Sequence, residues 1–307
     1  MLPTVLHQST IKDYCFCPKL FQYRHIDNLP PAFRNLSAVN GIVIHAVLRK
    51  LHTENWHLDP RQEYLDQFHY EENHSEETYI PIYWKGDRDA EVNKFTDEAV
   101  SIIEGYRSKD GNREARVFLV EASFMVKMGR AGPFAGTIDQ LRQAEDGSYE
   151  LVDFKTSKFT PDQAFLDTDY QFGIYAYALW KGSFQMPDGS VKMLHIPLDK
   201  LTIIWYHLRD HIPYKRATNG RSAGEEKCDP RRYTKRNTQQ LTELKCDLSK
   251  IALSIRRGIY PRHPSYSTCP VCPFAGICVE DSKGKGLNRN QQRQVKELVE
   301  EMHASQI

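Results

Sequence analysis

The sequence predicts an α/β fold in which a central sheet lies between helical segments. Helical periodicity dominates before residue 110, short apolar runs separated by turn-forming residues occupy 115–158, and helical periodicity returns toward the C-terminus. Each helix or sheet must bury its apolar face against another element, so this order favours layers around one core. The 307 residues are enough for a sizeable core, and we expect a single domain over 1–307.

The first helical segment begins near Ser9 or Thr10, either of which can cap it, and runs to His25. Pro18 interrupts the segment, so we expect two short helical pieces. A clearer helix covers 37–52, where apolar residues recur at helical spacing. Further helices are predicted at 90–109, 169–180, 236–257 and 288–304.

The strands are predicted from short apolar runs bounded by turn-forming residues. These runs lie at 115–128, 132–144, 149–158 and 200–208. The first three follow one another closely, which predicts a β-meander. Residues 54–90 have no firm period and receive only a weak assignment. Residues 212–236 are polar, basic and rich in turn formers, which predicts a loop or an insertion.

The composition is that of an ordinary globular protein, with 40% hydrophobic and 26% charged residues. The formal net charge of +1 indicates that any nucleic-acid-binding surface must be local. No apolar run approaches the roughly 20 residues that a membrane-spanning helix needs, and the start lacks the features of a secretory signal. We therefore expect a cytoplasmic protein without membrane association, whose cysteines are thiols or metal ligands.

Two acidic residues at strand ends form the most informative pattern. Asp139 ends the stretch GTID, and Asp153 ends the stretch LVD. Lys155 follows Asp153 by two residues, and the period of a strand places both side chains on the same face. If the two strands pair as a hairpin, Asp139 and Asp153 converge into an oxygen-rich site suited to Mg²⁺ or Mn²⁺. A lysine beside such a metal can orient or activate a water for attack on a phosphodiester.

An isolated D-x-K is usually a pair of surface charges beside a turn, and the surrounding sequence is what favours a catalytic site here. GTID at 136–139 followed by DFK at 153–155 resembles the PD-(D/E)XK nuclease superfamily, in particular its RecB-like exonucleases. GTID lacks the family's proline, a variation common in the RecB-like branch. The resemblance implies a restriction-endonuclease-like core, which is a mixed central sheet flanked by helices.

The same resemblance assigns further residues to the site. It implies that His45 is an additional metal ligand; the alternative is a histidine of the core. It also implies that the backbone carbonyl of Phe154 coordinates the metal. Gln171 and Tyr175, one helical turn apart, match the family's Q-x-x-x-Y helix, which supports the metal and the scissile phosphate; plain aromatic packing is the alternative. Glu121 lies on the preceding strand and is either an outer or second-metal ligand or a solvent-facing side chain.

Three cysteines near the C-terminus look like part of a metal site. Cys269, Cys272 and Cys278 lie in CPVCPFAGIC, and such sites usually have four ligands. STIKDYCFCPKLFQYRH resembles the N-terminal element of the iron–sulfur branch of these nucleases, which includes AddB-type subunits and the exonuclease associated with CRISPR spacer acquisition. That resemblance implies that Cys17 is the fourth ligand, with Cys15 as a fallback.

Four thiolates suit a [4Fe–4S] cluster or Zn²⁺, and the resemblance favours the cluster. Such a site would join residues 9–30 to residues 260–282 and fasten the N- and C-terminal helical segments together. Because it closes a very long loop, we expect it to stabilise the fold and not to act as a redox catalyst.

The densest basic stretch lies within the predicted loop, where it could follow a phosphate backbone or simply be solvated. The candidate DNA contacts are Lys215, Arg216, Arg231 and Arg232.

The sequence as a whole favours a metal-dependent DNA nuclease, an exonuclease or end-processing enzyme, with a structural iron–sulfur cluster. The alternatives are a non-catalytic DNA-binding or assembly subunit on the same fold, and a zinc-binding regulatory protein. The sequence contains no G-x-x-x-x-G-K-(S/T) motif, so we expect no motor of its own. The resemblance points to DNA repair, recombination or CRISPR-associated phage defence, in which a helicase or an integrase would be the partner.

Overall fold

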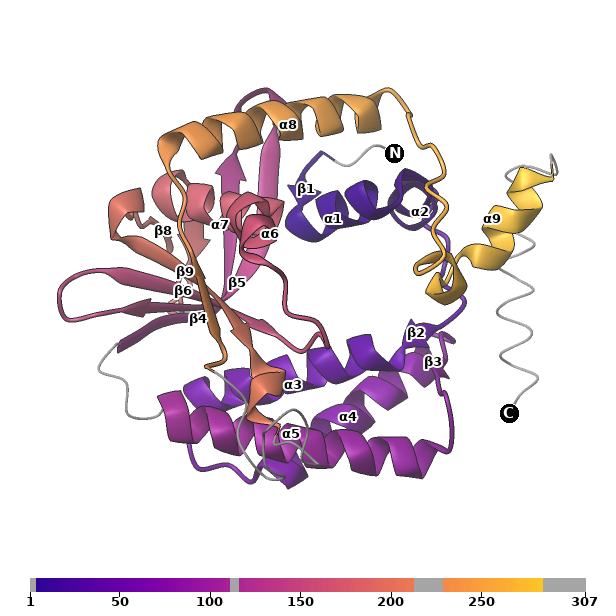
Figure 1. Ribbon diagram of the computed structural model, residues 1–307, viewed down its shortest axis with the longest axis horizontal. Coiled ribbons are helices and arrows are strands. Elements are labelled where there is room, and N and C mark those ends of the chain that lie inside the picture. Colours follow the sequence, from indigo (N-terminus) through magenta and orange to yellow (C-terminus); the bar gives the residue numbers. More distant parts are fainter. Residues whose placement is uncertain (1–3, 111–115, 213–228, 284–307) are drawn as a thin grey trace.

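The computed structural model describes residues 4–110, 116–212 and 229–283, and its centre is a mixed sheet. The strands of this sheet are β1 (Leu6–His7), β4 (Arg116–Lys127), β5 (Pro133–Gln143), β6 (Tyr149–Lys155), β7 (Ser183–Gln185), β8 (Val191–Met193), β9 (Leu201–His207) and β10 (Arg231–Thr234). Their order is β10-β9-β6-β5-β4-β7-β8, and β1 pairs with β5 (Figure 1). Helices lie on both sides of the sheet, so the predicted α/β fold is confirmed.

The middle of the sheet combines an antiparallel meander with one parallel pair. β4, β5 and β6 form the predicted meander, and β9 then pairs parallel with β6. A parallel partner needs a crossover, which contains α6 (Gln163–Thr168) and α7 (Tyr170–Lys181). Most residues of β6 and β9 are buried, as expected for central strands covered on both faces.

One face of the sheet is covered by α3 (Leu36–Thr53), α4 (Pro60–Glu77) and α5 (Arg88–Asp110), shown below the sheet in Figure 1. The first and last of these match predicted helices. α4 falls in the weakly assigned stretch, although Asp59 caps it and Pro60 occupies its first turn. It buries few apolar side chains, chiefly Tyr64 and Phe68, and the charged residues around them obscure the helical period.

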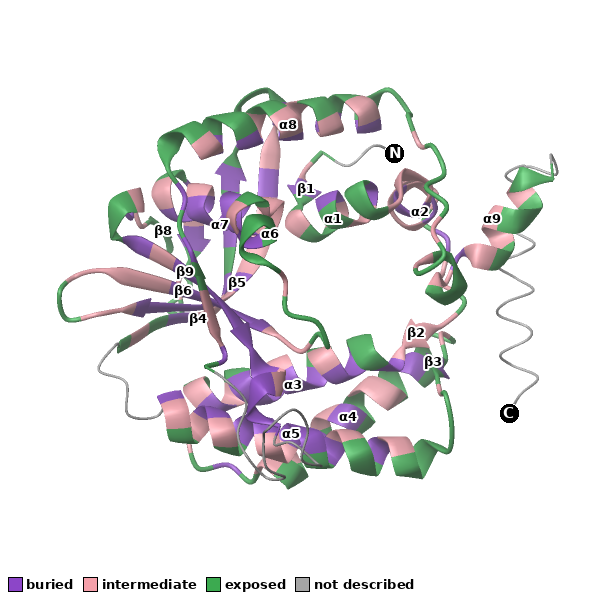
Figure 2. Cartoon of the chain, viewed as in Figure 1, coloured by how far each residue is buried: buried purple, intermediate pink, exposed green. Residues whose placement is uncertain are grey.

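The opposite face carries α1 (Gln8–Phe16), α7 and α8 (Thr238–Arg256), whose buried sides face the sheet in Figure 2. As predicted, the first helical segment is broken: α1 ends before Cys17, and Pro18 starts α2 (Pro18–Phe21). A π-helical turn over Gln22–Ile26 follows.

The N-terminal helical pieces are joined to α9 (Ala275–Ser282), the last helix of the described chain. A small apolar cluster, which we call the α2–α9 cluster, contains Leu20, Tyr23, Leu29 and Phe274. The Tyr23 hydroxyl donates to Asp281 at 2.7 Å, and the Lys19 ammonium lies 3.0 Å from the same carboxylate. Two regions that are far apart in sequence are therefore held side by side.

Two predictions near the C-terminal half need qualification. Arg231–Thr234 form strand β10, antiparallel to β9, where a loop was expected, because their backbone completes the edge of the sheet. Residues 213–228 and the predicted helix at 288–304 lie outside the described residues. A separate two-stranded parallel sheet pairs β2 (Arg34–Asn35), just before α3, with β3 (Ile82–Tyr83), just after α4. Among the described helices, none is long and apolar enough to cross a membrane.

A buried ion pair ties the sheet to α5. Arg142 on β5 donates to Asp110 at 3.0 Å and to the hydroxyl of Tyr106 at 2.9 Å. The two charged side chains are only 3% and 2% exposed. Buried charges are tolerated when they are paired and hydrogen-bonded, so each partner depends on the other.

We expect Asp110→Ala to lower the free energy of unfolding by about 3–5 kcal/mol, because Arg142 would remain buried without its partner. Asp89→Ala on the same helix is the matched control: its pair with Arg88 is exposed, with 78% of the Asp89 side chain in solvent, and should contribute under about 1 kcal/mol. Urea unfolding measures both values. Equal losses in the two variants would contradict the assignment.

Candidate active site

The site begins where β5 and β6 separate. The last pair of their ladder, toward the site, joins Gln140 to Val152. Beyond that pair, the N–H of Phe154 donates to Oδ2 of Asp139 at 2.7 Å. The carboxylate thus replaces the carbonyl that a neighbouring strand would have supplied, and this contact holds Asp139 in the gap between the strands.

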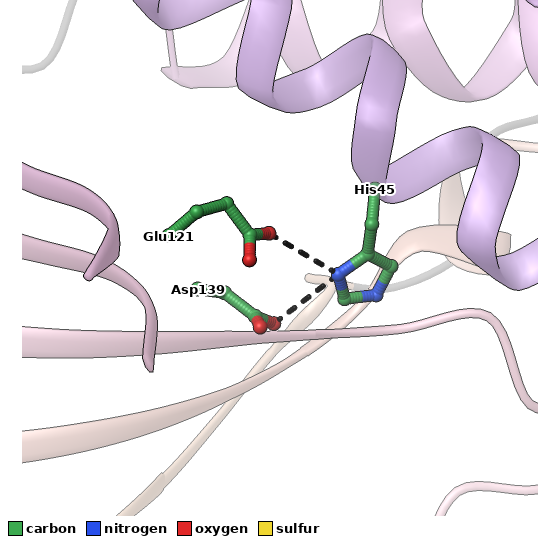
Figure 3. A group of neighbouring side chains, drawn as sticks. All are labelled: His45, Glu121 and Asp139. Carbon is green, nitrogen blue, oxygen red and sulfur yellow. Dashed lines mark ion pairs between the residues drawn. The ribbon is translucent and has the colours of Figure 1, made fainter. Parts of the chain in front are cut away.

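His45 on α3 faces this gap together with two carboxylates (Figure 3). Its Nδ1 atom lies 3.6 Å from Asp139 and 3.8 Å from Glu121, and its Nε2 atom lies 3.1 Å from the carbonyl oxygen of Phe154. When Nε2–H donates to that carbonyl, Nδ1 is left as an acceptor that points at the carboxylates, as in many metal-ligating histidines. Within the described chain, this trio is the one group of three or more such ligands whose donor atoms lie within 4.8 Å of one another.

Glu121 reaches the trio from a strained point of β4. Its φ of 46° lies in the left-handed region, which non-glycine residues rarely adopt and which costs on the order of 1–3 kcal/mol. Buried positions along β4 fall out of phase between Leu119 and Ala122, on either side of this residue. The distortion lets the carboxylate stand beside Asp139 on the neighbouring strand.

Asp153 and Lys155 share one face of β6, as their spacing predicts. The Lys155 ammonium lies 2.5 Å from Oδ2 of Asp153. Gln171 on α7 donates to Oδ1 of Asp153 at 3.1 Å and accepts from Lys155 at 3.4 Å. The Gln171 amide therefore holds both charged groups in position. Asp153 is only 1% exposed.

Tyr175 in turn holds Gln171 in place. Its hydroxyl donates to the carbonyl of Thr137 at 2.9 Å and accepts from Gln171 at 2.8 Å and from Gln8 at 3.1 Å. One buried hydroxyl thus joins α7, β5 and the start of α1. Sequence reasoning missed Gln8 and Thr137, because neither belongs to a motif and Thr137 acts through its backbone.

The charged groups shift one another's pKa values. Burial raises the pKa of Asp153 to about 6, although the charge of Lys155 opposes the shift. Burial also raises the pKa of Asp139, against the charge of His45. For Lys155, burial lowers the pKa, but the charges of Asp153 and Asp139 outweigh it, so the pKa lies above its ordinary value and the ammonium form is favoured. His45 follows the same pattern, with Asp139 and Glu121 raising its pKa against burial.

The side chains of the site open into one cavity of about 740 Å³. Its lining includes His45, Asp139, Asp153, Lys155, Gln171 and Tyr175. The cavity extends to the N-terminal part of α3 and to the segment that follows β6, residues 156–159. Its volume is in the range of small-molecule and nucleotide-sized pockets.

Of the predicted basic contacts, Arg231 and Arg232 are described by the structure, and neither lines this cavity. Arg231 lies 3.8 Å from Asp110, and Arg232 lies 3.4 Å from Asp210. Both guanidinium groups are therefore engaged within the fold. Lys215 and Arg216 lie outside the described residues.

The four predicted cysteine ligands come from the two ends of the described chain. Cys17, Cys272 and Cys278 pack against the α2–α9 cluster. Burial raises the pKa of Cys272, and the thiolate charges of Cys17, Cys278 and Cys269 raise it further. No group of three cysteines among the described residues has its sulfur atoms within 4.8 Å of one another.

A family model of the PD-(D/E)XK nuclease superfamily matches residues 6–279. The chain belongs to this superfamily, because the match covers most of its length. The resemblance noted in the sequence is thereby confirmed at the level of the superfamily.

Two solved structures are similar to the chain at low identity. One is a proposed exonuclease from Eubacterium rectale, with 11% identity, coverage of 89% of this chain and 88% of that chain, and a TM-score of 0.45. The other is described as SSO0001, with 11% identity, coverage of 78% and 94%, and a TM-score of 0.32. At these scores neither adds to the argument. No curated protein matches the chain.

The donor set fits a hard divalent cation. Carboxylate oxygens with one imidazole nitrogen suit Mg²⁺ or Mn²⁺. Burial is the main cause of the raised pKa values of Asp139 and Asp153, and a bound cation would stabilise the ionised forms of both carboxylates.

We expect His45→Gln to weaken Mn²⁺ binding by at least about tenfold, because the variant loses the imidazole nitrogen that faces the carboxylates. His69→Gln on α4 is the matched control, since His69 is an exposed histidine. Electron paramagnetic resonance of free Mn²⁺ in a titration measures both affinities. Equal affinity in the two variants would remove His45 from the ligand set.

Proposed function

We propose that the protein is a metal-dependent nuclease that hydrolyses phosphodiester bonds of DNA, working as an exonuclease or an end-processing enzyme. The observation that carries the proposal is the convergence of Asp139, Asp153, Lys155 and His45 on one cavity. Superfamily membership supplies the reaction class. The full ligand set argues against a non-catalytic subunit on the same fold.

Asp139 and Nδ1 of His45 would hold the metal, with Glu121 beside them. Asp153 lines the same cavity and is proposed as a further ligand, as is the carbonyl oxygen of Phe154, which lies 3.1 Å from Nε2 of His45. When bound, Mg²⁺ or Mn²⁺ supplies Lewis-acid stabilisation of the charge that builds on the phosphate oxygens. The protein's part is to keep these donors at fixed positions before the substrate arrives.

Lys155 acts in its ammonium form. Because its pKa is raised, it is poorly suited to take a proton from the attacking water, and instead donates hydrogen bonds to that water or to a phosphate oxygen. Asp153 and Gln171 hold the ammonium on the cavity side of β6. Tyr175 contributes as a positioning residue, because it contacts Gln171 and not the cavity's charged groups.

DNA contacts beyond the cavity remain a proposal for the basic residues of 212–236. A role for Arg231 or Arg232 on the phosphate backbone requires that they exchange Asp110 and Asp210 for phosphate oxygens. A helicase or an integrase is the partner that an end-processing role would involve.

We expect Asp153→Asn to lower DNA hydrolysis by at least about a hundredfold, because the variant loses a metal ligand and the partner of Lys155. End-labelled single- and double-stranded substrates with Mg²⁺ or Mn²⁺ provide the assay, and a chelator should abolish activity. Asp97→Asn is the control, since this exposed aspartate forms a surface ion pair with Arg61. A fully active, normally folded Asp153→Asn protein would refute the assigned site.

We also propose that Cys17, Cys269, Cys272 and Cys278 bind a [4Fe–4S] cluster that fastens α9 to the N-terminal helices. Support comes from the shared packing of the α2–α9 cluster and from the mutual effect of these thiols on Cys272. Four thiolates also suit a tetrahedral zinc site, so Zn²⁺ is the alternative metal for these cysteines.

We expect Cys17→Ser to lose most of the bound iron and to lower the thermal midpoint after anaerobic purification, because one of four ligands is gone. Cys246→Ser on α8 is the control, as this exposed thiol is not part of the α2–α9 cluster. Metal analysis and the visible absorption of the cluster measure the first effect. Protein with zinc and no iron would contradict the cluster assignment.

A further inference from the structure

An exposed aromatic ring stands at the rim of the proposed catalytic cavity. Phe159 is 85% exposed, yet it lines the same cavity as Asp139 and Asp153. Single exposed apolar residues are common on protein surfaces. This ring differs because it shares a cavity with the charged groups that would act on a phosphodiester.

The segment that carries Phe159 is anchored on both sides of the ring. The buried side chain of His207 lies 2.8 Å from the carbonyl oxygen of Ser157 and 3.3 Å from the hydroxyl of Thr160. The Ser157 hydroxyl also donates to the carbonyl of Phe159 at 3.0 Å. These polar contacts present the ring to solvent on a fixed stretch of backbone.

The same segment lies close to α3 across the cavity. A Cβ atom added at Gly41 would come within 3.0 Å of the Thr156 hydroxyl, so only a small residue at Gly41 leaves the two elements their present spacing. Figure 2 shows the exposed segment between β6 and α6 reaching toward α3. The segment is thus held near α3 at Thr156 and anchored to His207 on β9 at Ser157 and Thr160.

We propose that Phe159 is a stacking platform for an unpaired nucleobase of the DNA strand that enters the cavity, an inference that rests on the proposed nuclease function. Its neighbour Lys158 also lines the cavity and offers a cation for the backbone phosphate of the same strand. A basic side chain next to an aromatic ring is the usual means of holding single-stranded nucleic acid. Bases inside a duplex are covered on both faces by their neighbours, so the platform selects a single-stranded or frayed end.

The first test measures stacking without cleavage. Single-stranded oligonucleotides that carry 2-aminopurine at successive positions are bound to Asp153→Asn protein, and its fluorescence reports stacking on an aromatic ring. We expect quenching at one or two positions, lost when Phe159→Ala is added and kept with Phe159→Trp. Phe165→Ala is the matched control, since Phe165 is 53% exposed on α6 but does not line the cavity. Unchanged quenching in the Phe159→Ala protein would overturn the proposal.

The second test measures the substrate. Phe159→Ala should raise KM for a single-stranded end-labelled oligonucleotide roughly tenfold with kcat nearly unchanged, because one stacked base is lost. An abasic site at the quenched position of the oligonucleotide should raise the KM of the wild-type protein by the same factor. The same abasic site should cause no further rise in the KM of the Phe159→Ala protein. Additive effects of the two changes, or wild-type kinetics in Phe159→Ala, would overturn the platform. If the wild-type protein cuts no DNA, the nuclease proposal fails, and the fluorescence arm still decides the stacking.

Discussion

The hydrogen bond between the carboxylate of Asp139 and the N–H of Phe154 is the constraint on which the site depends. Two neighbouring strands that separate to make an opening leave backbone groups unpaired, and a buried unpaired donor costs about 1–3 kcal/mol. Asp139 satisfies the N–H of Phe154, and His45 meets its carbonyl oxygen at 3.1 Å. The Phe154 ring is buried in the core beneath α3, so the residue between Asp153 and Lys155 anchors the opening.

The site lies where the two helical layers meet at the end of the central strands. His45 comes from α3 on one face of the sheet, and Gln171 comes from α7 on the other. Burial raises the pKa of both carboxylates between them, and the charges of the lysine and the histidine offset only part of that shift. Packing of both helical layers against β5 and β6 therefore brings the charged side chains of the site together.

Much of this arrangement could be predicted from the sequence. Strong hydrophobic periodicity predicts the meander and α3 directly from the local sequence. The spacing of the acidic and basic residues likewise predicts the positions of Asp139, Asp153 and Lys155. α4 and β10 were missed, because charged residues hide the period of the first and the second owes its strand form to the edge of β9. The contacts of Gln8 with Tyr175 and the backbone turn at Glu121 arise only from tertiary packing, which no short motif encodes.

The left-handed backbone at Glu121 places selection for folding stability in conflict with selection for the carboxylate at the site. A glycine in place of Glu121 would relieve the backbone strain of β4. Selection for folding stability alone would therefore favour loss of the carboxylate. A lineage that keeps Glu121 therefore accepts a less stable β4 in return for a third acidic or imidazole group beside the cavity. Variants selected for thermal stability without an activity screen are expected to accept glycine at this position.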